Sequence, residues 1–176
     1  MAIYNGKHCV FEQVGVDSDN VIWNLSTNKD SDNCWNNWNI SNIRNTHLPA
    51  RLLLLSNDLQ SIITNTTVQT ATNGNNGTLV NTSDKLFLPA EKEMSGIQWY
   101  SRTEEFNALT TWSYWTNHTS SSDRIKYDST STATGYWTRS PVSDNANNAL
   151  FINTNGSFNG YYGAAANGHV SICYAF

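Results

Sequence analysis

The sequence predicts an α+β fold in which antiparallel sheets dominate. Strand-like segments occur near both ends of the 176-residue chain, and short helical segments lie between them. Asn-Gly and Gly turns separate the strand-like segments of the last third, as in an antiparallel sheet. A chain of this length is long enough for one well-packed domain and short for two, so we expect residues 1–176 to form a single domain.

Two strands and one helix are predicted in the first fifty residues. His8 to Val16 spaces apolar residues among polar neighbours, and Val21 to Leu25 is a short run rich in β-formers. Asn36 to Pro49 carries apolar residues around Ser41, a residue type that caps helix N-termini. This segment is the first helical candidate.

The next part of the chain predicts a second helix and then a loop. Leu52 to Leu55 is an apolar run that we expect to be buried, and Asp58 to Ile63 continues it. Pro49 is expected to prevent helix immediately upstream, because the residue before a proline is biased away from helical geometry. Thr64 to Ser83 combines Asn-Gly turns with no apolar period, which predicts a solvent-exposed loop.

The remaining segments alternate between short strands and aromatic-rich stretches. Lys85 to Leu88 predicts a short buried strand, and Ala90 to Met94 predicts one helical turn. Between Trp99 and Trp115 the chain carries six aromatic residues, most of which we expect in the core. From Gly135 onward, the segments YWTRS, ALFIN, SFNGYY and HVSICYAF predict a meander or antiparallel sheet.

The last third, residues 135–176, has the composition of a recognition surface. It is crowded with Asn, Tyr, Ser and Gly and is almost free of charge. Tyr supplies large, stiff contact area, while Ser, Asn and Gly supply adaptable hydrogen bonding. A catalytic segment would need acids, bases or nucleophiles, and this one holds few. We therefore expect a binding protein rather than an enzyme, with residues 135–176 forming the ligand-binding region.

Charge and hydropathy exclude several classes of partner. The formal net charge is −4 and the ten basic residues are scattered, so nucleic acid is not an expected partner. No window approaches the length of an apolar membrane span, and no signal peptide is recognisable at the start. We expect no membrane insertion, and the protein is either cytosolic or leaves the cell by another route, for instance as part of a virus particle. Of these, we expect a place on a virion or extracellular surface, reached without a recognisable signal peptide.

The sequence predicts no metal site and no cofactor. The three cysteines, Cys9, Cys34 and Cys173, include no C-x-x-C pair, which disfavours zinc. They are either three reduced, mostly buried thiols or one disulfide with a free thiol. A calcium site needs several charged oxygens, and Asp144 is an isolated acid among asparagines.

Four short motifs occur in a fixed order along the chain. They are W-N-I-S-N-I-R with Trp38, Ser41 and Arg44, then SDKLFLPAEKEM from Ser83 to Met94, then YWTRSP from Tyr136 to Pro141, and finally HVSICYAF. In this order they resemble the small C-type-lectin-fold domains of bacterial surface proteins and of phage and archaeal-virus receptor-binding proteins. The resemblance covers most of the chain. It departs from the family pattern at Pro89, where the family has Ser, and after Val170, where the family continues with Arg, Pro and Ala.

The resemblance implies an architecture. The C-type lectin fold has antiparallel sheets with two helices and long irregular loops, and its N- and C-terminal strands pair. An irregular region before the last strand carries the binding surface. Pairing of the terminal strands would bring Cys9 and Cys173 within reach of a disulfide, and Cys34 would then be the odd thiol.

The resemblance also implies a function. The family includes the variable proteins of diversity-generating retroelements, in which mutagenesis at adenines rewrites Asn codons near the C-terminus. The chain contains 25 Asn, and its last third is similar to that signature. The implied displayed residues are Asn145, Asn147, Asn148, Asn153, Asn155, Ser157, Asn159, Tyr161, Tyr162, Asn167 and His169. The implied partner is a protein or glycan on a host or target cell, and the oligomeric state stays open.

Two other classes compete with a binding protein. Relatives with the formylglycine-generating version of the fold are enzymes that use a pair of cysteines, whereas Cys173 stands alone in the C-terminal half. A purely structural virion or surface-layer module is the third class. We expect Arg139 to satisfy buried carbonyls or a carboxylate, and Tyr136 and Trp137 to lie in the core. Asn148 and Asn155 are expected either to cap turns or to contact a partner.

Overall fold

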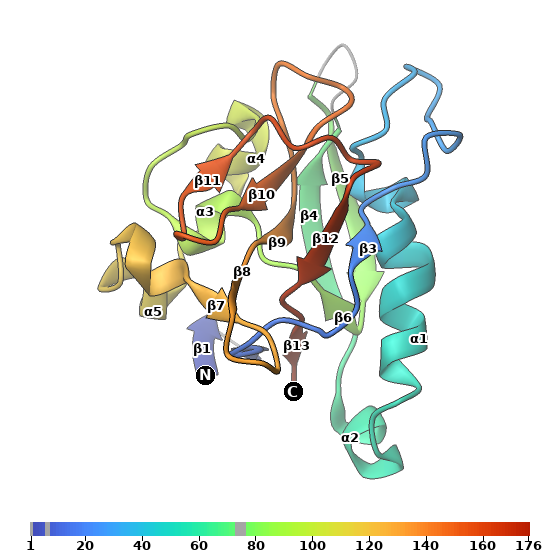
Figure 1. The fold of residues 1–176 in the computed structure, drawn as a ribbon. Coiled ribbons are helices and arrows are strands. Elements are labelled where there is room, and N and C mark those ends of the chain that lie inside the picture. Colours follow the sequence, from blue (N-terminus) through green and yellow to red (C-terminus); the bar gives the residue numbers. More distant parts are fainter. Residues whose placement is uncertain (1, 6–7, 73–76) are drawn as a thin grey trace.

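The protein is a mixed α/β structure built from small, mostly antiparallel sheets and short helices (Figure 1). The computed structural model describes residues 2–5, 8–72 and 77–176. A four-stranded and a five-stranded sheet are accompanied by two two-stranded ribbons. The predicted α+β class is confirmed at this level. Among the described residues, no helix is long and apolar enough to cross a membrane.

The four-stranded sheet joins the two ends of the chain. Its order is β1 (Ala2–Asn5), β2 (His8–Glu12), β13 (Cys173–Ala175) and β6 (Leu86–Phe87), and every pair is antiparallel. The predicted pairing of the terminal strands is therefore present, with β13 between β2 and β6. The short β6 matches the strand predicted at Lys85 to Leu88.

The register of β2 and β13 does not place Cys9 opposite Cys173, the pairing that the resemblance left open as a disulfide. Cys173 lies opposite Glu12, and Ala175 lies opposite Val10, so Cys9 is not the partner of Cys173. Cys34 and Cys173 are both free and buried, which confirms reduced thiols at these two positions. The side chain of Cys9 lies outside the described residues.

The five-stranded sheet contains the C-terminal third and one early strand. Its order is β11 (Phe158–Asn159), β10 (Ala149–Ile152), β9 (Tyr136–Pro141), β12 (Asn167–Val170) and β3 (Val21–Ile22). The β9–β10–β11 part is the predicted antiparallel meander. However, β12 pairs in parallel with β9 and not with β11, its predecessor in sequence. Alternation of apolar residues specifies a strand but not its partner, so the sequence could not reveal this pairing.

The first helical region continues through Pro49, contrary to expectation. A 3₁₀ turn, η1 (Trp38–Ile40), precedes the π-helical η2 (Ile43–His47), which runs directly into α1 (Leu48–Leu52). Ser41 Oγ accepts the Arg44 N–H at 3.2 Å, so Ser41 acts at the helix start as predicted. Pro49 lies in the first turn of α1, where a missing N–H is tolerated, and the wider π-type turn precedes it.

The leucine run at the end of this helix is only partly buried, because Leu52 and Leu55 pack against the core and the two leucines between them are exposed. Leu53 is 74% and Leu54 72% exposed. A separate helix, α2 (Asn57–Ile62), begins after Ser56, whose hydroxyl accepts the Leu59 N–H at 3.4 Å. Because the Ser56 cap starts a new helix, the two segments do not form the single buried helix that was predicted.

The predicted loop at Thr64 to Ser83 is a β-hairpin. Strands β4 (Thr66–Ala71) and β5 (Leu79–Asp84) pair antiparallel from Thr66–Asp84 to Ala71–Leu79. The loop prediction was wrong because it counted threonines as polar, although Thr and Val are good strand formers on a half-buried surface. The Asn-Gly tip at residues 73–76 lies outside the described residues.

The segment between Met94 and Gly135 is composed of short elements. The helical turn α3 (Glu91–Met94) forms as predicted, followed by α4 (Thr103–Ala108), α5 (Ser113–Thr116), the 3₁₀ turn η3 (Ser121–Arg124) and the ribbon of β7 (Lys126–Tyr127) with β8 (Ala133–Thr134). Of the six aromatic residues predicted mostly in the core, Trp112 and Trp115 are buried, whereas Trp99 is 58% exposed. The other three are half-buried.

The centre of the core is built from tryptophans. Trp23, Trp38 and Trp137 are fully buried, and the rings of Trp23 and Trp38 meet edge to face at 6.3 Å. Tyr136 is also fully buried, so the expected core positions of Tyr136 and Trp137 are confirmed. These large rings hold β9 in place beneath the C-terminal loops.

Candidate functional site

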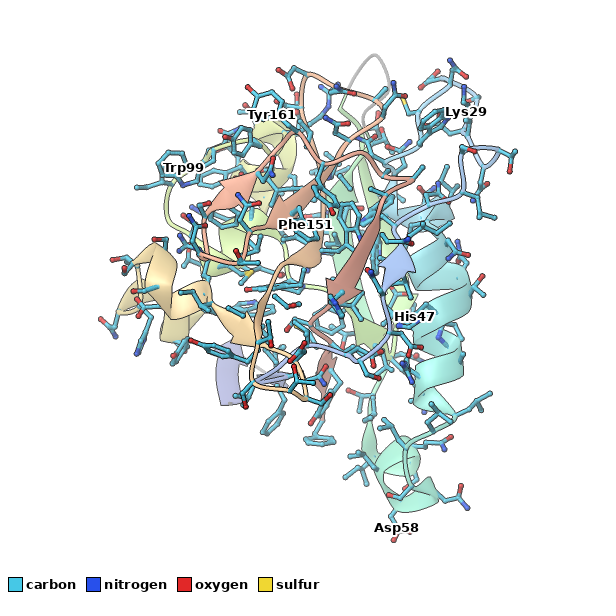
Figure 2. The ribbon with its side chains drawn as sticks, viewed as in Figure 1. Lys29, His47, Asp58, Trp99, Phe151 and Tyr161 are labelled. Atoms are coloured by element: carbon cyan, nitrogen blue, oxygen red, sulfur yellow. The ribbon has the colours of Figure 1, made fainter. Side chains whose placement is uncertain are left out.

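A hollow on the C-terminal third collects part of the predicted binding set. We call it the C-terminal hollow. It has a volume of about 540 Å³ and is lined by Asn20, Gly135, Phe151, Asn153, Thr154, Asn155, Tyr162, Asn167, Gly168 and His169. Phe151 marks its position in Figure 2. Five of the predicted displayed residues, Asn153, Asn155, Tyr162, Asn167 and His169, therefore lie around one concavity.

The floor of the C-terminal hollow is a stack of aromatic rings. Phe151 and Tyr162 lie parallel, with centroids 4.1 Å apart and an interplanar angle of 9°. Trp137 meets both rings edge-on, at 4.9 Å from Phe151 and 5.1 Å from Tyr162. The indole N–H of Trp137 donates to the Val21 carbonyl at 3.1 Å, which fixes the ring against β3. A floor held by packing and by a hydrogen bond is rigid before any ligand arrives.

A chain of amide and hydroxyl groups orders the rim. Asn159 Nδ2 donates to Asn153 Oδ1 at 3.0 Å, and Asn153 Nδ2 donates to Ser157 Oγ at 3.0 Å. The Ser157 hydroxyl in turn donates to Asn155 Oδ1 at 2.7 Å, and the Ser157 N–H donates to the same oxygen at 3.1 Å. Asn155 therefore caps a turn and lines the hollow at the same time.

Strand β12 supplies the opposite side of the hollow. His169 Nδ1 lies 2.9 Å from the Asp17 carbonyl, which accepts only, so Nδ1 carries the proton of the neutral ring. This leaves Nε2 as an acceptor. The Tyr162 hydroxyl donates to the Asn167 carbonyl at 3.1 Å, while the Asn167 side chain is exposed. The hollow thus offers amide, imidazole and hydroxyl groups, and no carboxylate lines it.

The other predicted residues do not line this hollow. Asn148 Nδ2 donates to the Gly160 carbonyl at 2.9 Å, and Asn145 Oδ1 accepts the Asn147 N–H at 2.9 Å, so these side chains stabilise turns. Tyr161 is 84% exposed and meets Tyr100 edge-on at 6.1 Å. The remaining two, Ser157 and Asn159, join the rim through hydrogen bonds.

The described residues provide no assembled metal site and no activated thiol. No three His, Cys, Asp or Glu side chains in the described part of the chain gather where they could share an ion. Burial raises the pKa of Cys173 well above its ordinary value and, more modestly, that of Cys34. Both groups are therefore protonated thiols near neutral pH, and the thiolate is the reactive form.

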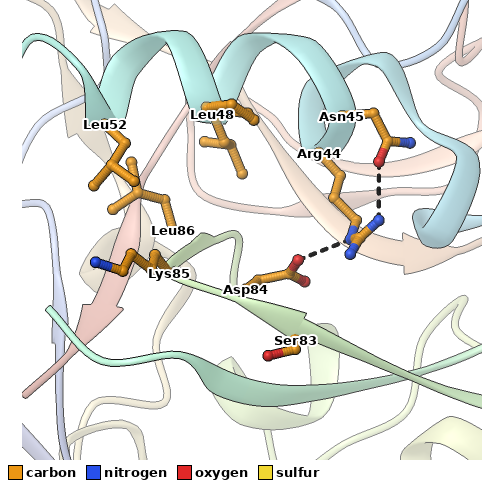
Figure 3. A pocket seen from close by; sticks show the side chains of 9 residues that line it. Arg44, Asn45, Leu48, Leu52, Ser83, Asp84, Lys85 and Leu86 are labelled. Atoms are coloured by element: carbon orange, nitrogen blue, oxygen red, sulfur yellow. Dashed lines mark hydrogen bonds and ion pairs between the residues drawn. The ribbon is translucent and has the colours of Figure 1, made fainter.

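Two of the quoted motifs meet at Asp84. Its Oδ2 accepts the Trp38 indole N–H at 3.1 Å, and its Oδ1 accepts Arg44 Nε at 2.8 Å (Figure 3). Arg44 Nη1 also donates to the Asn45 side chain at 2.9 Å. A hollow of about 270 Å³ lies beside this contact. Because Arg44 and Asp84 satisfy each other, the contact joins the first helix to β5.

The second and third of the quoted motifs meet at Glu93. Arg139 of β9 donates to both Glu93 oxygens and to the Leu88 carbonyl. The expectation that Arg139 satisfies a carboxylate and a buried carbonyl is therefore confirmed. The contacts of Asp84 and Glu93 therefore stabilise the fold, and none of the residues that make them lines the C-terminal hollow.

A comparison with protein-family models shows which family the chain belongs to. A family model described as "Domain of unknown function (DUF6273)" matches residues 13–173. The chain belongs to the DUF6273 family. No curated protein and no solved structure matches it. The DUF6273 match spans every residue of the C-terminal hollow and both motif contacts.

Sequence reasoning missed several residues that shape this DUF6273 surface. Phe151 belongs to a strand-like run and was read as sheet only, and Asn20 carries no local signal. Trp99 and Tyr100 are among the six aromatic residues expected mostly in the core, but Trp99 is 58% exposed, and Tyr100, which meets Tyr161 edge-on, is only partly buried. Their exposure depends on Glu91, whose buried carboxylate holds the loop backbone, and no sequence pattern reports such a contact.

Proposed function

We propose that this DUF6273 chain is a ligand- or receptor-binding protein, not an enzyme, and that its binding surface lies on the C-terminal third. The observation that carries the proposal is the C-terminal hollow, where five residues of recognition-type composition surround a stacked aromatic floor. The volume of the hollow lies in the range of ligand pockets, and its lining combines aromatic rings with convergent polar groups.

The chemistry of the hollow favours a neutral partner. Its rim is made of amides and hydroxyls, and its floor of aromatic rings, so contacts would combine hydrogen bonds with ring packing. We propose a protein or glycan on a host or target cell, recognised from a virion or cell surface. Such binding would survive a chelator and would depend weakly on salt, because none of the described residues that line the hollow is a carboxylate or a fixed cation.

The finer fold proposal is a C-type lectin fold. The pairing of β2 with β13 supports it, as do the contacts of Asp84 with Trp38 and Arg44, and of Glu93 with Arg139, which join the motifs that resemble that family. The same resemblance supports diversification by a retroelement. The test is the flanking DNA: an imperfect repeat of the codons for residues 144–169 together with a reverse transcriptase gene supports diversification, and their absence from the intact locus contradicts it.

Isosteric charge changes test the binding surface. Asn155→Asp with Asn167→Asp keeps the acceptor that caps the turn and adds two negative charges to the rim. Asn65→Asp with Asn107→Asp adds the same charge at exposed positions elsewhere. Labelled protein is measured on printed glycans and on panels of intact bacterial, archaeal and animal cells, with and without EDTA.

The expected result is binding by the wild type and by the control pair, and loss of binding by the rim pair. Equal binding by the rim and control pairs would place recognition outside the hollow. Absence of wild-type binding on every glycan and cell type would favour a purely structural module. Loss of binding in EDTA with recovery in Ca²⁺ would contradict the metal-free mode.

A further inference from the structure

A second pocket lies next to the β10–β11 hairpin and contains a buried cation. We call it the Arg124 pocket. It has a volume of about 470 Å³ and is lined by Trp99, Tyr100, Thr119, Ser121, Arg124, Ser157 and Phe158. None of these residues lines the C-terminal hollow. The two concavities therefore share a hairpin but no wall.

No carboxylate in the described part of the chain forms an ion pair with Arg124; burial lowers the pKa of its guanidinium, and the charges of Asp123 and Glu91 oppose that shift from farther away. It is only 6% exposed. Its Nε donates to the Gly156 carbonyl at 2.9 Å, and its guanidinium carbon lies 4.7 Å from the centroid of the Phe158 ring. No acceptor among the described residues engages either of its terminal nitrogens. Arg44 and Arg139, by contrast, are each paired with a carboxylate.

A buried guanidinium without a counter-ion is energetically unfavourable. Removing a cation from water carries a penalty that a single carbonyl and a ring face offset only in part. Arginine stays charged at any physiological pH, so the charge is not relieved by loss of a proton. The unused N–H groups of Arg124 are the planar fork that binds oxyanions with two parallel hydrogen bonds.

The outer wall of the pocket is fixed in advance by a buried acid. Glu91 Oε1 accepts the N–H groups of Trp99 and Tyr100 at 3.1 and 3.0 Å, and its Oε2 accepts the Ser101 N–H at 2.9 Å. Trp99 is 58% exposed, so this wall presents an indole ring to solvent. A ring held on an anchored backbone gives an apolar contact without ordering a loop on binding.

The base of the pocket is equally constrained. Gly156 has a φ of 78°, and a Cβ at this position would lie 1.8 Å from the Ser121 carbonyl oxygen. The hairpin turn therefore packs directly on η3, which carries both Ser121 and Arg124. Ser121 and Thr119 also line the pocket and carry hydroxyl groups that can donate hydrogen bonds.

We propose that the Arg124 pocket is a binding subsite for a carboxylate attached to an aromatic or other apolar body. The carboxylate would take the free N–H groups of Arg124, and the apolar body would pack against the Trp99 indole. The inference rests on the geometry around Arg124 and does not depend on the proposed function of the C-terminal hollow.

Titration of the full ¹⁵N-labelled chain with benzoate tests the subsite directly. We expect saturable shifts of the Arg124 Nε–H and Trp99 indole N–H signals. Benzamide, which has the same shape without the charge, should bind at least about tenfold more weakly. Acetate carries a carboxylate without the aromatic ring, and inorganic phosphate carries negative charge without either. Their affinities therefore separate the contribution of the apolar body from that of the charge. Equal binding of benzamide, or tighter binding of phosphate than of benzoate, would overturn the carboxylate assignment.

Variants assign the effect to the pocket. Arg124→Gln should weaken benzoate binding at least about tenfold, and Trp99→Ala about threefold or more. Lys92→Gln is the matched control, because the Lys92 ammonium also lies over a ring, 4.1 Å from Phe106, but lines no part of the Arg124 pocket. Trp99 is exposed, so Trp99→Ala decides the question even if Arg124→Gln does not fold.

The Asn155→Asp and Asn167→Asp pair separates the two proposals. This pair should retain benzoate binding while it loses binding to cells or glycans. Unchanged benzoate affinity in both Arg124→Gln and Trp99→Ala, or shifts confined to residues outside the pocket, would refute the subsite.

Discussion

Arg139 and Glu93 form a bidentate ion pair inside the protein. Arg139 Nη1 lies 2.6 Å from Glu93 Oε2, and Arg139 Nη2 lies 2.6 Å from Glu93 Oε1. Both residues are buried, and Glu93 Oε2 also accepts the Ala90 N–H at 2.9 Å. The pair therefore ties strand β9, which lies under the candidate binding surface, to helix α3.

Removal of one partner of this pair should strongly destabilise the protein. Glu93→Ala leaves the Arg139 guanidinium buried without compensation, and we expect a loss of about 3–5 kcal/mol. The control is Asp19→Ala. Asp19 is a partner of Arg51, and its side chain is about half exposed, so we expect a loss of at most about 1 kcal/mol. Urea denaturation measures both. Similar losses for the two variants would contradict a structural role for the buried pair.

Glu105 should make stability depend on pH. Its carboxylate is fully buried and accepts hydrogen bonds from the Ser140 hydroxyl and from the Ala71 N–H. Burial raises the pKa of Glu105 from 4.5 to about 7, although the nearby Arg139 opposes the rise. Because the folded state binds this proton more tightly than the unfolded state, the contribution of Glu105 to the free energy of unfolding is fully present below pH 4.5. It is lost as the pH rises to about 7.

The loss from Glu105 amounts to about 3 kcal/mol across this window. Glu105→Gln removes the titration, so the difference in unfolding free energy between wild type and variant should change between pH 4.5 and 7 and be constant outside it. Urea titrations at a series of pH values give this difference, in which the contributions of other groups cancel. A difference that is flat over the whole range would mean that Glu105 is ionised in the folded protein.

Gly156→Ala should disrupt the turn that supports both concavities. The positive φ of 78° disfavours any side chain, and the new Cβ would overlap the Ser121 carbonyl oxygen. We expect a loss of at least about 2 kcal/mol. Gly163→Ala is the control, because a Cβ there meets nothing within 4 Å. Thermal and urea denaturation of the two variants should differ clearly, and equal stability would refute the close approach.

Truncation of Trp137 and truncation of Tyr161 should have opposite consequences for stability, one large and one negligible. Trp137 is fully buried beneath the hollow, and Trp137→Ala should lower stability by about 3–5 kcal/mol. Tyr161 is 84% exposed, so Tyr161→Ala should change stability by no more than about 0.5 kcal/mol. If denaturation showed equal losses, the interpretation of Tyr161 as a displayed residue would fail.

Deletion of residues 169–176 should unfold the protein. The deleted segment contains β13, which lies between β2 and β6, and it includes the buried Val170 and Cys173. Circular dichroism and the cooperativity of urea unfolding measure the outcome. A truncated chain that unfolds cooperatively with wild-type stability would show that the terminal sheet is dispensable.

Local patterns determined the elements whose identity depends on near neighbours. Strands β9 and β10, the turn α3 and the cap at Ser41 were all predicted, because alternation and capping act over a few residues. The N–H donors of Arg139 predicted that it satisfies buried carbonyls or a carboxylate, and it bonds one of each, the Leu88 carbonyl and Glu93. The hairpin β4–β5 was missed because threonine is polar by composition but a strand former in a half-buried ribbon.

The sequence by itself determined which residues are suited to recognition: the asparagines, tyrosines and serines of the last third. The tertiary structure decided which of them meet. The parallel pairing of β12 with β9 brings Asn167 and His169 across from Asn153 and Asn155, and packing on Ser121 closes the Arg124 pocket. Strand partners and buried charges depend on contacts between residues far apart in sequence, and no local pattern encodes those contacts.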